Sequence, residues 1–298
     1  VVGPWLAEVG YEALYWLPFV RWFQDRFAVS PERLWVLSRG GVGTWYADTA
    51  RHYVDIFDLM PPDEVASRNA ARQTQDEGGG QKQSGLGAFD QELLARFQRR
   101  TGVDRYQVLH PSLMFTIFRH VWHHNLPFDF LWRRTRFARM TLPSVPIDGL
   151  APQSYVALKV YSGVAVPMTD DNRRVLRAVV EQLAARTPVV VLDADLPVDE
   201  HRDFTFDDIP NVQSARRLMT PASNLGIQSG LIAGASAFVG TCGGLAWMAP
   251  LLGVPTVAIY DDDRLLDIHL MVARQAHKRV GGAEFSVVDL RAWRRLGF

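Results

Sequence analysis

The sequence predicts an α/β protein of two domains, each built on a mostly parallel β-sheet, and three observations support this. Short apolar runs alternate with segments of helical period, which is typical of strand–helix–strand units. The same alternation begins again after a stretch rich in Pro and Gly at 143–152, which is typical of an interdomain linker. The length of 298 residues suits two ordinary domains. We therefore expect an N-terminal domain over 1–150 and a C-terminal domain over 151–298.

The first half contains four apolar runs that we expect to be strands and four segments that we expect to be helices. The strands fall at 1–2, 34–37, 54–59 and 106–109. The helices fall at 11–27, 44–52, 89–100 and 112–132, the last one broken at Pro127. The stretch 67–87 is rich in Gln, Gly and Ser and shows no hydrophobic period, so it is expected to be a loop or lid.

The second half follows the same order. The expected strands are 155–161, 189–192, 237–239 and 256–260, and the expected helices are 170–186, 225–235, 245–252, 264–277 and 290–296. Two such halves predict two Rossmann-like domains that face each other across a cleft. Ligands of open parallel sheets bind beyond the carboxyl ends of the strands, so the cleft is the expected binding site.

Composition excludes several classes of protein. The 32 basic residues balance 32 acidic ones, so we expect no nucleic-acid partner. The single cysteine, Cys242, allows neither an intrachain disulfide nor a multi-thiolate metal site. No apolar run reaches the ~20 residues of a membrane span. We expect a cytoplasmic protein, with peripheral membrane contact through the aromatic first helix as an alternative.

The segment 237–256 carries the clearest chemical signal. A buried strand leads through a turn containing Gly243 and Gly244 directly into a short apolar helix. The free N–H groups at the start of that helix would bind a diphosphate, because they point at the ligand and the helix dipole favours negative charge. Thr241 adds a hydroxyl, and Cys242 is expected to fill space in the same cradle rather than to act as a nucleophile.

This segment, with Asn224 to Ser229 before it and the strand entry at 252–256 after it, resembles the donor end of GT-B glycosyltransferases. It is most similar to heptosyltransferase-like and O-fucosyltransferase-like enzymes. The resemblance implies a GT-B fold and a nucleotide-diphosphate-sugar donor held by the C-terminal domain. The heptosyltransferase pattern has an acidic residue before a Thr-Gly pair, and this chain departs from the pattern at that point. It departs from fucosyltransferases where Leu158 to Ser162 replaces an Arg-rich strand.

Other residues expected to bind the donor follow from the rule that ligands lie at strand ends. They are Lys159, Tyr161 and Ser162 after the first strand of the second half, Asp193 and His201 after the next, and Asn224 and Gln228 at i, i+4 on one helix. Lys159 would add positive charge near the phosphates. Asp193 and His201 would bind the nucleoside through hydrogen bonds, and Asn224 and Gln228 would contact its base or ribose.

An inverting sugar transfer needs a base that takes the proton from the attacking hydroxyl. Glu8, in the first strand-to-helix loop, is the first candidate. Asp48 and His110, the latter directly after a strand, are the others. Glu12 is expected at a helix start as a partner of the helix dipole. Arg39 and Gly41, in a second Gly-rich loop, would bind an anionic acceptor or a phosphate.

The predicted function is inverting, metal-independent transfer of a sugar to a hydroxyl of a glycan, lipid-linked or small-molecule acceptor, as in bacterial polysaccharide or glycoconjugate synthesis, with no cofactor. One alternative is a sugar-nucleotide epimerase. Another is a metal-dependent GT-A transferase, because the triplets 193–195 and 261–263 each place two or more Asp after a strand, where hard cations bind. A third alternative is a non-catalytic binder of sugar nucleotides or glycans.

Overall fold

The computed structural model describes residues 1–75, 82–194, 201–264 and 266–295. Two compact units divide the chain. The first unit comprises Val1–Phe137 and Thr220–Gly226, and the second comprises Ala138–Met219 and Ile227–Phe298. The boundary thus falls at 137/138, whereas the sequence placed it at 150/151, and a short later segment joins the first unit. The cleft expected between two domains stays a prediction.

The first unit contains a small parallel sheet with the strand order of a Rossmann domain. Strand β1 (Trp35–Ser38) pairs in parallel with β2 (His52–Asp55). Val2 bridges in parallel to Val36 on one side and to Leu109 on the other. Numbered along the chain, these two strands and two bridging residues follow the order third, second, first, fourth, as the first four strands of a Rossmann sheet do.

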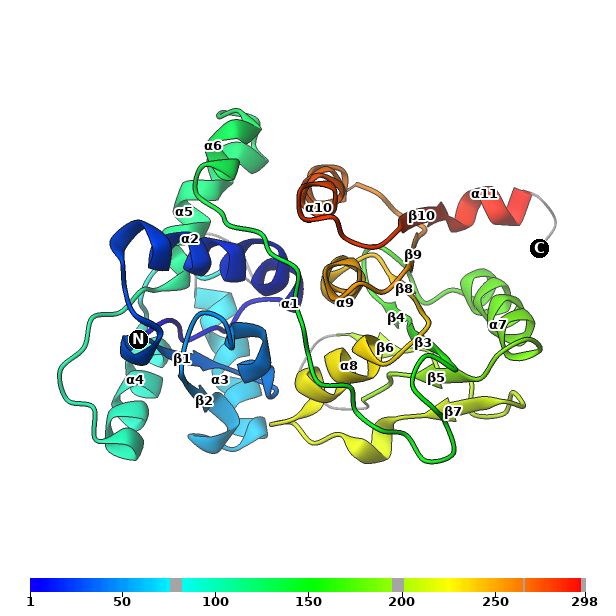
Figure 1. Ribbon diagram of the computed structural model, residues 1–298, viewed down its shortest axis with the longest axis horizontal. Helices are drawn as coiled ribbons and strands as arrows, with labels where there is room; N and C mark the ends of the chain where they lie inside the picture. Colours follow the sequence, from blue (N-terminus) through cyan, green and yellow to red (C-terminus); the bar gives the residue numbers. More distant parts are fainter. Residues whose placement is uncertain (76–81, 195–200, 265, 296–298) are drawn as a thin grey trace. The chain divides into compact units, whose positions relative to one another are not determined.

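Helices and 3-10 turns complete the first unit (Figure 1). They are α1 (Val9–Tyr11), the π-helical η1 (Glu12–Trp16), α2 (Leu17–Phe27), η2 (Pro31–Arg33), η3 (Val42–Tyr46), η4 (Ile56–Asp58), α3 (Pro62–Gln75), α4 (Ala88–Thr101), α5 (Pro111–Trp122) and α6 (Phe128–Trp132). The expected first helix is confirmed, as is the break at Pro127. One apolar cluster centred on Leu37, Ile56, Leu93 and Phe97 packs the sheet against its neighbours.

Three expectations for the first unit are wrong. The expected strand at 54–59 is β2, which ends at Asp55, and a 3-10 turn follows it. The expected helix at 44–52 is a 3-10 turn that ends at Tyr46, and the following strand begins at His52. The expected loop at 67–87 is helical up to Gln75. Ala, Arg and Gln favour a helix in this segment, although it has little apolar surface to bury.

The second unit is a doubly wound α/β domain. Its sheet contains β3 (Val156–Lys159), β5 (Val189–Val191), β7 (Val212–Ser214), β8 (Ala237–Thr241), β9 (Thr256–Tyr260) and β10 (Phe285–Asp289), all parallel. The spatial order is β10-β9-β8-β3-β5-β7. Along the chain this is 6-5-4-1-2-3, the Rossmann order. Two short strands, β4 (Tyr161–Ser162) and β6 (Arg202–Asp203), pair separately and antiparallel.

Helices cover both faces of this sheet (Figure 1). They are α7 (Asp170–Ala184), η5 (Arg216–Leu218), α8 (Asn224–Ala233), α9 (Gly244–Met248), η6 (Ala249–Leu252), α10 (Asp267–Val280) and α11 (Leu290–Arg295). Figure 1 shows α7 and α11 on one side of the sheet and α9 and α10 on the other. The predicted class, an α/β chain with two Rossmann-like domains, is therefore confirmed by strand order. Among the described residues, no helix is long and apolar enough to cross a membrane.

Candidate functional site

The Gly-rich turn lies where the sequence placed it, between β8 and α9 at the carboxyl edge of the six-stranded sheet. Trp247 N–H is the first amide of the helix with an intrahelical acceptor, the carbonyl oxygen of Gly243 at 3.0 Å. Within the described residues, no protein acceptor is present for the N–H groups of Gly243, Gly244 and Leu245. These amides are the donors that an anion would satisfy.

Four residues expected at the donor site come together beside this turn. The Tyr161 hydroxyl lies against the Cα of Gly243, in the space that a Cβ would need. The Thr241 hydroxyl accepts from the Tyr161 N–H (3.1 Å) and donates to the Tyr161 carbonyl oxygen (3.2 Å). The ring of His201 lies 4.4 Å from that of Tyr161, centroid to centroid. Thr241 therefore links β8 to β4, and Ser162 pairs with Arg202 on the far side of β4.

Lys159 and Asp193 reach the same edge, but both bind other protein groups. The Lys159 ammonium lies 2.8 Å from the Asp203 carboxylate and donates to the Leu192 carbonyl oxygen at 2.9 Å. Its charge is thereby neutralised. Asp193 is buried and accepts from the Ser214 hydroxyl (2.6 Å) and from the Arg216 guanidinium. Both side chains hold strand ends together.

A positive charge that acts on the Cys242 thiol is that of Arg274 on α10, a residue that the sequence did not suggest. Helix α10 runs alongside the segment that follows β8. His277 contacts the carbonyl oxygen of Trp247 at 2.8 Å. Just beyond the helix, the Ala283 N–H donates to the carbonyl oxygen of Pro250 at 3.0 Å. Arg274 lies one turn before His277. It lines a pocket of about 370 Å³ whose other lining residues fall between His277 and Phe285, and no ion pair joins it to a described residue.

Cys242, expected to fill space, lies in a buried position. Burial raises the pKa of the thiol to about 12, opposed by the positive charge of Arg274. A thiol in this state is not a nucleophile at neutral pH. The same interaction places the Arg274 charge close to the Gly-rich turn.

Asn224 and Gln228 lie on α8 as expected, both buried. The Asn224 amide donates to the Pro221 carbonyl oxygen at 2.8 Å. Asn224 belongs to the first unit and Gln228 to the second, because the division between the units crosses this helix. A shared role at the nucleoside stays a prediction.

Glu8, the first candidate for the base, follows a loop that the first unit holds firmly. Gln83 accepts from the Leu6 N–H (2.9 Å) and donates to the Pro4 carbonyl oxygen (2.9 Å). Asn69 donates to the Leu6 carbonyl oxygen at 3.3 Å. Glu8 itself is half-buried and occupies the N-cap position of α1, where its side chain makes no capping hydrogen bond.

A lysine that the sequence did not suggest interacts with Glu8. The Lys82 ammonium lies 5.5 Å from the ring centroid of Tyr11 and 5.2 Å from that of Trp122. Burial lowers the pKa of Lys82, and the Glu8 carboxylate opposes that shift. Because attraction between opposite charges stabilises both ionised forms, Lys82 favours a carboxylate at Glu8, the form that a base requires.

His110 lies in a buried network. Its Nε2 is 3.1 Å from Asp90, which is fully buried, and its Nδ1 accepts from the Ser112 N–H at 3.2 Å. Gln83 also donates to Asp90 at 3.0 Å. Both ring nitrogens thus have partners within the protein, an arrangement typical of a structural histidine.

The loop of Arg39 and Gly41 packs within the first unit. Arg39 is buried and donates to the Ala7 carbonyl oxygen at 3.4 Å. Gly41 N–H donates to Asp55 at 2.8 Å, so this amide is not available to a phosphate. Gly41 has a φ of 77°, and its carbonyl oxygen is 2.5 Å from where a Cβ on Gly226 would lie. Close packing between this loop and 220–226 therefore explains glycine at positions 41 and 226.

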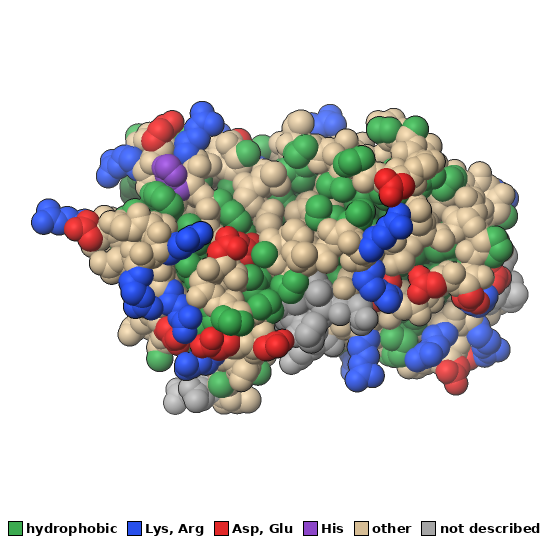
Figure 2. Space-filling model, turned by 90° about the horizontal axis from the view of Figure 1, so that it is seen from below, with side chains coloured by type: hydrophobic (Ala, Val, Ile, Leu, Met, Phe, Trp, Pro, Cys, Tyr) green, Lys and Arg blue, Asp and Glu red, His purple; other side chains and the backbone are tan. Residues whose placement is uncertain are grey.

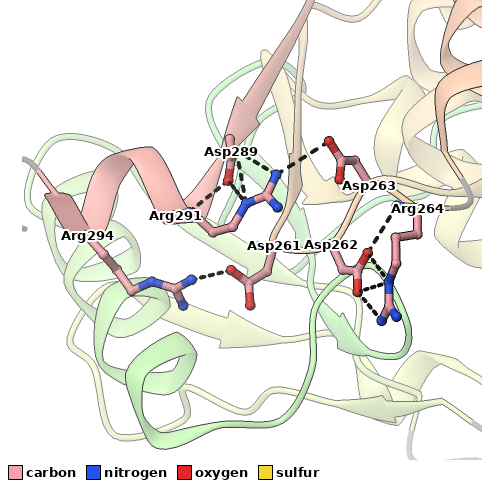
Figure 3. A network of polar contacts seen from close by, with 7 residues as sticks. All are labelled: Asp261, Asp262, Asp263, Arg264, Asp289, Arg291 and Arg294. Atoms are coloured by element: carbon pink, nitrogen blue, oxygen red, sulfur yellow. Dashed lines mark hydrogen bonds and ion pairs between the residues drawn. The ribbon is translucent and has the colours of Figure 1, made fainter.

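The acidic triplet 261–263 is an arginine–aspartate network (Figure 3). Its three carboxylates point at three different guanidinium groups, those of Arg294, Arg264 and Arg291. Arg264 lowers the pKa of Asp262 to about 2. Among the described residues, no three His, Cys, Asp or Glu side chains converge as metal ligands. Asp195, of the other triplet, lies outside the described residues.

Charges of both signs are interspersed on the face of the molecule that Figure 2 shows. This agrees with the formal net charge of zero. Among the side chains that this view colours by type, Lys and Arg form no continuous stripe like that of a nucleic-acid interface.

No family model matches the chain, and no curated protein matches it. Among solved structures, it is similar to the iron-containing dodecameric glycosyltransferase TibC from enterotoxigenic E. coli, with 14% identity and a TM-score of 0.46. This match covers 87% of the chain and 57% of TibC. A second TibC structure, described as a heptosyltransferase in complex with ADP-D-β-D-heptose, matches at 16% identity and a TM-score of 0.43, over 88% of the chain and 56% of that structure.

Two further glycosyltransferases match less well. SnogD from Streptomyces nogalater matches at 14% identity, with a TM-score of 0.35 and 94% of each chain covered. The E. coli heptosyltransferase WaaC matches at 12% identity, with a TM-score of 0.35 and 87% of each chain covered. Because every TM-score is below 0.5, the fold assignment rests on strand order. In fold the chain is a pair of Rossmann-like α/β units, similar to heptosyltransferases and another glycosyltransferase.

Proposed function

We propose that the chain is a glycosyltransferase that moves a sugar from a nucleotide-diphosphate-sugar donor to a hydroxyl acceptor, with inversion and without a metal ion. The observation that carries this proposal is the set of unsatisfied N–H groups at Gly243, Gly244 and Leu245. They lie at the carboxyl end of a strand in a Rossmann-ordered sheet, where such folds bind nucleotides. The likeness of the 237–256 segment to GT-B donor sites agrees with it.

In this proposal the donor diphosphate accepts hydrogen bonds from these amides, and Arg274 supplies positive charge. The acceptor oxygen forms a bond to the anomeric carbon while the bond from that carbon to the phosphate oxygen breaks. The hydroxyl proton passes to the Glu8 carboxylate, and the nucleoside diphosphate leaves as an anion. Hydrogen-bond donors that are already in position before charge develops on the phosphate stabilise such a leaving group without reorganising.

A thermal-shift screen against UDP, GDP, ADP, CMP and dTDP tests donor binding. One nucleoside diphosphate is expected to raise the Tm, because a ligand that binds only the folded state stabilises it. The corresponding nucleotide sugar is then offered with simple hydroxyl acceptors, and release of the nucleoside diphosphate is measured. Failure of every nucleotide to bind would contradict the proposal. Binding without release, in the presence of acceptors, would favour a non-catalytic binder.

A further inference from the structure

The pocket of about 370 Å³ beside α10 lies within the second unit, and none of its lining residues belongs to the Gly-rich turn. Three nitrogen-bearing side chains line it from one face of the helix, those of Arg274, His277 and Lys278 at spacing i, i+3, i+4. Residues 281–283 and Phe285 complete the lining. Among the described residues, no acidic side chain lines this pocket, so the ligand that it fits is an anion.

The two cations of the pocket are not neutralised by the part of the protein that the structure describes. Both Arg274 and Lys278 are exposed, and no ion pair joins either of them to a described carboxylate. Basic residues near the C-terminus of a helix offset the helix dipole, and this accounts for Lys278, since α10 ends at Val280. The dipole acts only over the last turn, so it does not account for Arg274.

The backbone amides around the pocket have acceptors inside the protein. The N–H groups of Gly281 and Gly282 both donate to the His277 carbonyl oxygen, the second at 2.8 Å, and that of Ala283 donates to Pro250. An anion in the pocket would therefore be bound by side chains. Gly282 leaves room for it beside His277, because a Cβ at position 282 would lie 3.3 Å from both Cα and Cβ of His277.

The imidazole of His277 has one nitrogen without a partner, although the residue is only 5% exposed. Its Nε2 lies 2.8 Å from the Trp247 carbonyl oxygen, which can only accept, so Nε2 carries the hydrogen. In the neutral ring Nδ1 is then an acceptor, and it has no hydrogen-bond partner among the described residues. Burial lowers the pKa of His277, opposed by the hydrogen bond to Trp247, so the neutral ring is the form to consider.

We propose that this pocket binds inorganic phosphate as the hydrogen phosphate dianion. Its oxygens accept hydrogen bonds from Arg274 and Lys278, and its hydroxyl donates to Nδ1 of His277. The combination of two cations and one acceptor requires a ligand that carries both negative charge and a proton. Sulfate and the dianion of a phosphomonoester have the charge but no hydroxyl on the anionic group. The proposal goes beyond the transferase function and does not depend on it.

Titration calorimetry at pH 8 compares hydrogen phosphate, sulfate and glycerol 3-phosphate, which are dianions at this pH. Wild type is expected to bind hydrogen phosphate about 10-fold more tightly than the other two, because only hydrogen phosphate satisfies the buried Nδ1 acceptor. In His277→Gln, whose amide keeps a donor for the Trp247 carbonyl oxygen, the preference is expected to disappear. Equal affinity of wild type for the three dianions, or an unchanged preference in His277→Gln, would overturn the proposal.

Lys278→Gln provides a second test that does not depend on how His277→Gln folds, because the Lys278 side chain is exposed. It is expected to weaken the binding of hydrogen phosphate and sulfate by the same factor, several-fold, so that the preference remains. Arg186→Gln is the matched control, since it removes one positive charge from an exposed position of the same unit and should bind as wild type does. Equal losses in Lys278→Gln and Arg186→Gln would contradict a site at the pocket.

The same variants separate this pocket from the proposed donor site, where phosphate would also find N–H donors. Phosphate binding that neither His277→Gln nor Lys278→Gln changes belongs to the Gly-rich turn and overturns the proposal for the pocket. If no nucleotide binds and no sugar is transferred, but phosphate binds with the stated preference and the variants respond as expected, the transferase proposal fails and the phosphate pocket stands.

Discussion

The hydroxyl of Tyr161 occupies the space that a side chain at position 243 would need. Gly243 has extended backbone, with φ 171°, so its conformation alone does not demand glycine. Close contact with Tyr161 does. Close packing against Tyr161 therefore explains why position 243 is glycine. The phosphate proposal requires only the exposed amide of the same residue, so an experiment can separate these two roles.

Gly243→Ala is expected to displace the Tyr161 ring tip and to weaken nucleotide binding, whereas adding Tyr161→Phe restores it. Without the hydroxyl, the atom nearest to the new Cβ is Tyr161 Cζ at 3.4 Å, an ordinary contact. Alanine keeps the backbone N–H, so the anion donor survives in the double variant. Titration calorimetry with the nucleotide identified by thermal shift measures this. Full loss of affinity in the double variant would show that glycine is needed for another reason.

Much of the fold could be predicted from the sequence, since most strands and helices fall within a few residues of their expected places. The exceptions have physical reasons. Strands β7 and β10 were missed because Gln213, Ser214, Ser286 and Asp289 break the apolar runs. These strands lie at the two edges of the sheet, where less apolar surface is buried.

The site was less predictable, because sequence position shows which residues lie at strand ends but not which protein groups they bind there. Lys159 was expected near the phosphates, yet Asp203, 44 residues later, neutralises it. Arg274 lies on a helix whose register against α9 is set by contacts such as that between His277 and Trp247. No local pattern in the sequence encodes that register.

Arg274→Gln is expected to weaken nucleoside-diphosphate binding about 10-fold, which corresponds to about 1.4 kcal/mol. The guanidinium is the uncompensated charge near the turn, and hydrogen bonds to charged groups contribute more than neutral ones. Affinity for the nucleoside without phosphates should not change. Arg186→Gln, on the exposed surface of the same unit, is the control. Equal affinity in Arg274→Gln and wild type would remove Arg274 from the site.

Gln83→Ala is expected to destabilise the first unit by about 1–3 kcal/mol, the usual cost of leaving buried polar partners unsatisfied. Gln83 is buried and contacts Pro4, Leu6 and Asp90. Gln98→Ala, an exposed position on α4, should change stability by less than about 0.5 kcal/mol. Urea unfolding followed by tryptophan fluorescence compares the variants. Similar midpoints for both would mean that the loop is held mainly by other contacts.

Transfer activity is expected to persist in EDTA and to be insensitive to Asp262→Asn. The Asp262 carboxylate is paired with Arg264 at the surface, where an ion pair contributes little to stability. A GT-A-type mechanism predicts the opposite, because there the triplet carboxylates hold the divalent ion that stabilises the leaving diphosphate. Loss of activity in EDTA, restored by Mn²⁺, would therefore favour the metal-dependent alternative.

Glu8→Gln is expected to lower kcat about 10²–10⁴-fold, the usual contribution of a general base, with nucleotide affinity unchanged. Glutamine keeps the size of the side chain but cannot accept the proton. The loop before it is held by Gln83 and Asn69, so the backbone should stay in place. His110→Gln supplies the comparison: because His110 contacts Asp90 and Ser112, its loss should lower stability more than kcat of the folded fraction. If Glu8→Gln retains wild-type kcat while His110→Gln loses it without unfolding, the base is His110 and not Glu8.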